Sequence, residues 1–208
     1  KDPRNLYARK LLASTLLKNG QAQRAIEILS PALKDAQQDP QLLSLAGESH
    51  MRSKDFTKAT EYFEKASAID PENPMLHTAL GMSKLAQGEN GRAVAELETA
   101  ANLDTQSSRA DILLVMTHLR LKAFDKALTA AKALEKEQPD NPLAYNLKGT
   151  AYLGKKDMAN ARASFEKALS RQPTYFPAVA NLAQLDLIEK KPDAAKKRFE
   201  AILEKDNK

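Results

Sequence analysis

The chain has 208 residues, of which 42% are hydrophobic and 28% charged, a composition typical of folded chains and not of disordered ones. The net charge of +5 is mild and aromatic residues make up only 5%, which argues against a nucleic-acid binder with a continuous basic stripe and stacking aromatics. Cysteine is absent, which excludes disulfides, thiolate zinc sites and cysteine nucleophiles, and no apolar run approaches the roughly 18 residues of a membrane-spanning helix.

One alanine recurs every 34 residues without an insertion, at Ala25, Ala59, Ala93, Ala127, Ala161 and Ala195. A fixed period of this length is typical of a solenoid built from one stacked supersecondary unit. Because a solenoid grows by adding units that contact their neighbours, the length of the chain does not predict one or two domains around a central core.

Counting this alanine as position 20 divides the chain into six units, preceded by residues 1–5 as the end of an earlier unit. The units are 6–39, 40–73, 74–107, 108–141, 142–175 and 176–208. Residues 2–5 match positions 31–34 of a repeat, and neither end shows the polar capping helix that solenoids normally carry. We therefore expect a fragment of a longer array.

Each unit is predicted to form two helices joined by a short turn. Residues that favour the N-cap precede the first helix of five units, namely Asn5, Asp39, Asn73, Ser107 and Asn141. A proline that suits the first helical turn follows three of them, at Pro40, Pro74 and Pro142. The second helices are expected to begin after the candidate caps Asp55 and Asp157, and at Pro192 in the last unit.

Small residues at positions 8 and 20 are expected to let the two antiparallel helices of a unit approach closely, and the large residue at position 24 is expected to fill the gap between neighbouring units. In the second unit these residues are Gly47, Ala59 and Phe63. The fourth unit departs from the pattern, because it has Val115 at position 8, Ala131 at position 24 and Leu134 where position 27 is usually alanine. We interpret this as an exchange of volume that keeps the local core filled.

The pattern resembles the tetratricopeptide repeat family over essentially the whole chain. Unit 142–175 carries the signature residues most fully, with Tyr145, Gly149, Tyr152, Ala161, Phe165, Ala168 and Pro173. The resemblance implies an all-α fold, a right-handed α-solenoid of six tandem helix-turn-helix hairpins. It also implies a non-catalytic scaffold for protein or peptide partners, although the fold alone does not determine the function.

In this family the first helices line a concave groove, and its positions carry over to a set of candidate protein-binding residues here. They are Met51, Met75, Thr78, Met82, Leu85, Arg109, Ile112, Met116, Leu119, Arg120, Leu143 and Asn146. Methionine is flexible and polarizable and suits surfaces that accept varied apolar partners, so an extended or helical apolar segment is the expected ligand. The alternative is that some of these methionines, Met51 above all, pack in the core. The arginines, with Arg52, are candidates for a charged rim facing an acidic partner or for ordinary solvated side chains.

Other sites are not expected. A carboxylate clamp for chaperone tails needs a set of Lys, Asn and Arg residues, of which only Lys10 is matched. His50 and His118 share position 11 and are interpreted as buried and satisfied, or half-exposed, side chains rather than metal ligands, and His77 is a single histidine elsewhere in the repeat. No catalytic constellation or phosphate-binding loop is present, so no enzyme activity, cofactor or metal is predicted.

Several functional classes stay open beside the leading one. The chain is also similar to bacterial repeat lipoproteins of exopolysaccharide export and the exosortase (PEP-CTERM) sorting system. That similarity implies the periplasmic face of a bacterial membrane, with a lipid anchor outside this fragment. The alternatives are a cytoplasmic assembly scaffold, the targeting or regulatory arm of a larger enzyme such as a glycosyltransferase, and an RNA-binding repeat, which the apolar groove disfavours.

Overall fold

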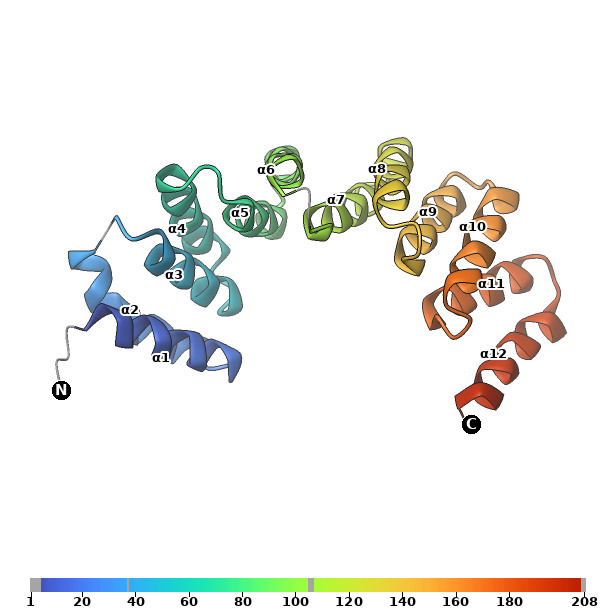
Figure 1. The fold of residues 1–208 in the computed structure, drawn as a ribbon, viewed down its shortest axis with the longest axis horizontal. Helices are drawn as coiled ribbons and strands as arrows, with labels where there is room; N and C mark the ends of the chain where they lie inside the picture. The colour runs from blue at the N-terminus through green and yellow to red at the C-terminus, as the bar shows by residue number, and fades with distance from the viewer. Residues whose placement is uncertain (1–4, 37, 105–106, 207–208) are drawn as a thin grey trace. The chain divides into compact units, whose positions relative to one another are not determined.

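The computed structural model describes residues 5–36, 38–104 and 107–206, and within these ranges it consists of twelve α-helices without a strand (Figure 1). This confirms the predicted all-α class. The helices are α1 (Leu6–Lys18), α2 (Ala22–Asp35), α3 (Pro40–Arg52), α4 (Phe56–Ile69), α5 (Pro74–Gln87), α6 (Asn90–Leu103), α7 (Arg109–Arg120), α8 (Phe124–Glu137), α9 (Pro142–Gly154), α10 (Met158–Arg171), α11 (Phe176–Ile188) and α12 (Pro192–Asp206). They pair in chain order as helix-turn-helix hairpins, while the exact repeat boundaries stay a prediction.

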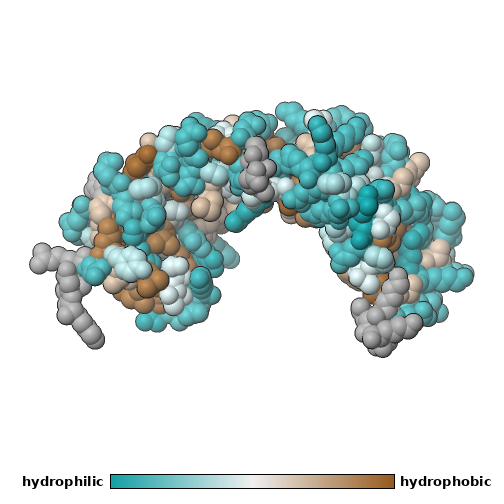
Figure 2. All heavy atoms as spheres, in the orientation of Figure 1, coloured by the Kyte–Doolittle hydropathy of each residue, from teal (hydrophilic) through white to brown (hydrophobic). Residues whose placement is uncertain are grey.

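The chain forms two compact units, Lys1–Ala110 and Asp111–Lys208. The first unit contains α1 to α6 and the first two residues of α7, and the second contains the rest of α7 and the helices up to α12. On the face drawn in Figure 2, hydrophobic residues form separate patches among hydrophilic ones in both units.

In four hairpins the first helix begins directly after the residue that the sequence predicts as its N-cap. The side chains of Asn5, Asp39, Asn73 and Asn141 each accept a hydrogen bond from a backbone N–H of the first turn, at 2.9 to 3.1 Å. In α7 the helix begins at Arg109, so Ser107 does not stand next to it; its N–H donates instead to Asp104 Oδ1 at 2.9 Å. Caps at α4 and α10 are confirmed, since Asp55 and Asp157 accept from backbone N–H groups there.

The turn inside each hairpin has the same backbone geometry in all six cases. One residue per turn has a positive φ, between 56° and 83°, and these residues recur every 34 positions: Gly20, Lys54, Gly88, Lys122, Lys156 and Lys190. In the second hairpin the Lys54 N–H donates to Met51 O at 3.1 Å and the Asp55 N–H to His50 O at 2.9 Å. This pair of bonds is the Schellman motif, which satisfies the last carbonyls of a helix and stops it.

The two helices of a hairpin approach closely where a glycine faces a large side chain. A Cβ atom built on Gly47 would lie 2.7 Å from Phe63 Cε1, so no other residue fits there without a shift. In the α7–α8 hairpin the sizes are reversed, because Val115 and Ala131 are both fully buried in one cluster with Leu134. The arrangement fits the volume exchange that the sequence indicates.

Position 11 of the first helix holds buried titratable side chains in four hairpins. His50 and His118 are 7% and 5% exposed, which confirms the interpretation of both as buried. Burial lowers the pKa of His50 below its ordinary value, although Asp55, 3.2 Å from its Nδ1, opposes that shift. At the same position Asp186 lies 2.8 Å from Arg162 Nη1 and also accepts from Arg198. Burial raises the pKa of Asp186, but the two arginines together bring it below its ordinary value.

The contact at Gly47 yields a first prediction. Gly47→Ala is expected to destabilise the first unit by about 1–3 kcal/mol, because the added methyl group overpacks a rigid, buried phenyl ring. Gly91→Ala is the matched control, since nothing lies within 4 Å of the added Cβ and alanine favours the helix by about 0.5–1 kcal/mol. The midpoint of urea unfolding, followed by circular dichroism, is the measurement. Equal midpoints for the two variants would show that Phe63 yields freely.

The positive φ values yield a second prediction. Lys122→Gly is expected to raise the thermal midpoint, because the left-handed conformation costs a residue with a Cβ atom about 1–2 kcal/mol that glycine does not incur. The matched control is Lys132→Gly inside α8, where the lysine is exposed and glycine costs about 1 kcal/mol. Both variants lose one positive charge, so a rise in both midpoints would point to charge and not to backbone conformation.

Candidate functional site: a cleft between α3 and α5

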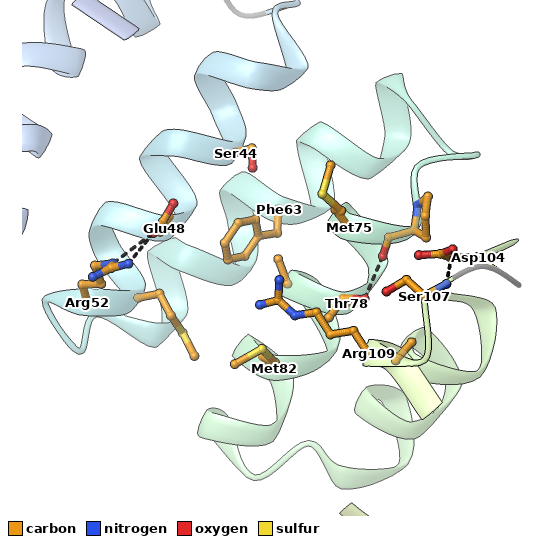
Figure 3. A pocket seen from close by; sticks show the side chains of 14 residues that line it. Ser44, Glu48, Arg52, Phe63, Met75, Thr78, Met82, Asp104, Ser107 and Arg109 are labelled. Carbon is orange, nitrogen blue, oxygen red and sulfur yellow. Dashed lines mark hydrogen bonds and ion pairs between the residues drawn. The ribbon is translucent and has the colours of Figure 1, made fainter. Parts of the chain in front are cut away.

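A cleft of about 680 Å³ opens in the first unit between α3 and α5 (Figure 3). Asp104, Ser107 and the first two residues of α7 also line it. The lining residues are Ser44, Glu48, Met51, Arg52, Phe63, Pro74, Met75, Thr78, Ala79, Met82, Asp104, Ser107, Arg109 and Ala110. Five of the sequence-predicted binding residues therefore come together here: Met51, Met75, Thr78, Met82 and Arg109.

Helical spacing explains why these side chains share one opening. Met75, Thr78 and Met82 stand three and four residues apart on α5 and so lie on one face of that helix. Ser44, Glu48 and Met51 do the same on α3. Phe63 of α4 is 3% exposed and lies against Gly47, which allows its ring to fill the space behind α3.

The three methionines of the cleft differ in exposure. Met75 is 71% exposed and Met82 is 37% exposed, so both present sulfur and methylene groups to solvent. Met51 is half-buried and packs against the core cluster of Ala59, Phe63 and Leu80. Met51 therefore belongs in part to the core, while Met75 and Met82 form an accessible apolar surface.

Most polar groups of the cleft already have partners within the protein. Arg52 forms an ion pair with Glu48 at 2.8 Å and its Nη1 donates to Leu17 O at 3.2 Å, at the end of α1. The Thr78 hydroxyl donates to Pro74 O at 2.8 Å. The Asp104 carboxylate accepts from the Ser107 N–H. Dashed lines in Figure 3 mark this bond, the Thr78 bond and the Arg52–Glu48 pair.

The remaining sequence-predicted residues lie outside the cleft. Leu85 is further along α5 and does not line it. Met116 and Arg120 are exposed on α7, in the second unit. Three more, Ile112, Leu119 and Leu143, pack against the buried cluster around Val115. Asn146 is buried and its Oδ1 accepts from Asn181 Nδ2 at 2.9 Å, so its side chain holds α9 and α11 together.

Several lining residues escaped the sequence prediction. Pro74 and Ala79 occupy positions next to the groove positions of α5, and the sequence pattern predicts Phe63 as a packing residue only. Asp104 and Ser107 come from the connection before α7, whose path a helical repeat pattern does not specify. Ser107, which its residue type predicts as an N-cap, is the one residue here for which the sequence carries a signal.

The residues considered for other sites are engaged elsewhere. Lys10, the one match to a carboxylate clamp, lies 2.8 Å from Asp39 Oδ2 and 3.1 Å from Gln41 Oε1. Burial raises the pKa of Asp39, but Lys10 and the backbone N–H groups of α3 together lower it below its ordinary value. His77 pairs with Glu96 at 2.8 Å. In the described part of the chain no three His, Asp or Glu side chains gather as a metal site would need, and no helix has the length and apolarity to cross a membrane.

Solved structures resemble the chain over most of its length. The structure of MamA aligns with a TM-score of 0.72 and 23% identity, over 81% of this chain and 92% of that one. YrrB, described as a tetratricopeptide repeat protein with an unusual peptide-binding site, aligns with a TM-score of 0.68 and 23% identity, over 82% of this chain and 88% of that one. At this level of identity the similarity supports the predicted α-solenoid of hairpins and nothing further.

Sequence comparison identifies the family. Human FKBP4, a peptidyl-prolyl cis-trans isomerase, is 30% identical in an alignment 196 positions long that covers 84% of this chain and 42% of that protein. The chain thus spans less than half the length of this relative. Models of the family described as tetratricopeptide repeat match residues 10–74, 78–142, 112–176 and 152–208, which together cover nearly the whole chain. The chain belongs to the tetratricopeptide repeat family.

Proposed function

We propose that this chain is a binding scaffold that holds an extended or helical apolar segment of a partner protein in the cleft between α3 and α5. The observation that carries the proposal is the exposure of Met75 and Met82 on the wall of a cleft of about 680 Å³. Exposed apolar side chains gathered at one concave place are typical of docking sites, whereas single ones scattered over a surface need no explanation.

The chemistry of the cleft suits a peptide better than a small polar metabolite. Sites for small molecules usually present several convergent polar groups that fix one orientation. Here Thr78 donates within its own helix, and Glu48 and Arg52 neutralise each other. Flexible methionine side chains adapt to the varied apolar surface of a peptide. That YrrB, a protein of the same fold, is described as having a peptide-binding site supports this choice.

A second candidate is that the repeats serve as the targeting arm of a larger enzyme. The observation that favours it is the match to human FKBP4, whose name is that of an isomerase and of which this chain spans 42%. An activity assay on the complete gene product tests it. The narrower assignment to exopolysaccharide export or exosortase sorting rests on the composition and spacing of the helices alone and stays a prediction.

The binding proposal is tested with the 208-residue chain on an array of immobilised random 15-residue peptides, acetylated and amidated at their ends. The wild-type chain is expected to select peptides rich in apolar residues. Met75→Glu combined with Met82→Glu should weaken binding of the selected peptides at least about tenfold, because apolar contacts are replaced by charges that must be desolvated.

The control is Met116→Glu, which makes the same type of substitution once, with one added negative charge instead of two, at an exposed methionine that does not line the cleft. Helical content, read by circular dichroism, should be equal in all three proteins. Equal loss of binding in the control and in the double variant would move the site away from the cleft, and the absence of any selected peptide would remove the proposal.

A further inference from the structure

Arg109 stands out among the charged residues of the cleft. It is the first residue of α7 and is exposed, and Figure 3 shows its side chain extending from α7 among the residues that line the cleft. Among the residues that the structure describes, Arg109 makes no hydrogen bond or ion pair. Its five N–H donors are therefore not engaged by other residues in the described part of the chain.

The other cation of the cleft is not available in the same way. Arg52 bonds to both Glu48 of its own helix and the backbone carbonyl of Leu17. The second bond joins the C-terminal end of α1 to α3. A guanidinium held by a carboxylate and a carbonyl has little attraction left for a ligand anion. Arg109 is thus the arginine of the cleft whose charge an incoming group would meet.

The position of Arg109 is not explained by the stability of its helix. The N-terminus of a helix carries a partial positive charge, so a cation in the first turn is unfavourable by about 0.3–1 kcal/mol. Arg109 nevertheless lies at this place, lines the cleft and bonds to no anion in the described part of the chain. A ligand that supplies the anion would explain its position.

We propose that Arg109 binds a side-chain carboxylate of the partner segment, an Asp or Glu with apolar neighbours that Met75 and Met82 contact. This inference rests on the proposed function. The planar guanidinium matches a carboxylate with two parallel hydrogen bonds. A phosphate group is disfavoured, because the Asp104 carboxylate also lines the cleft and would repel a dianion more strongly than a single carboxylate.

The test continues from the peptide array. Because both ends of each peptide are blocked, only side chains can supply a carboxylate. The wild-type chain is expected to enrich peptides with Asp or Glu between apolar residues, and Arg109→Gln should select apolar peptides without that acidic preference. Arg92→Gln is the matched control, since Arg92 is exposed on α6, loses the same charge and does not line the cleft.

Affinities of one selected acidic peptide and its amide analogue, measured by fluorescence anisotropy, give the quantitative step. Wild type should bind the amide analogue about tenfold to a hundredfold more weakly, the range expected for a charge-assisted hydrogen bond. Arg109→Gln should bind the two peptides equally. Arg109→Lys should recover only part of the difference, because an ammonium group keeps the charge but lacks the planar fork.

The outcomes separate the two proposals. Selection of apolar peptides without acidic preference, or an acidic preference that survives Arg109→Gln, overturns the role of Arg109 and leaves the binding cleft in place. Acidic selection that disappears equally in Arg92→Gln shows a general effect of net charge and also overturns it. Peptide binding that is unchanged by the two methionine substitutions overturns the cleft itself.

Discussion

The left-handed residue in the turn of each hairpin is the constraint on which the rest of the fold depends. A Schellman turn stops the first helix after a set number of residues, and the second helix then starts at once. Because all six turns share this geometry, equivalent side chains recur at a constant interval of 34 residues. That constancy brings Ser44, Glu48 and Met51 of α3 opposite Met75, Thr78 and Met82 of α5 and so creates one cleft.

Close approach of the helices is the second half of the same constraint. Where Gly47 faces Phe63, the ring fills the space that a side chain on α3 would take, and the two helices touch. The α7–α8 hairpin solves the same problem with Val115 against Ala131. The space between the two helices is therefore filled in both hairpins, but the large side chain comes from the second helix in one and from the first helix in the other.

The sequence predicts the helices well because their signals are local. Periodic alanine, Asn and Asp caps and prolines in the first turn each act within a few residues, and the structure follows them closely. The left-handed lysines are not visible in this way, because only Gly20 and Gly88 carry the residue that the conformation prefers. The exposure of Met75 and the core contact of Met51 were likewise undetermined, since both occupy groove positions and only tertiary packing distinguishes them.

The repeat pattern does not predict the lining residues that lie between α6 and α7. Asp104 and Ser107 lie between α6 and α7, whereas Arg109 occupies a groove position that the repeat predicts, in a helix that begins later than the register implies. The regular part of the cleft offers apolar contact, which gives affinity with little discrimination among partners. Arg109 adds one guanidinium without a partner in the described part of the chain, and a ligand lacking an anion at that point would have to desolvate this group without a compensating bond. On the proposed function, we therefore expect discrimination among partner segments to come from Arg109 and affinity to come from the apolar side chains.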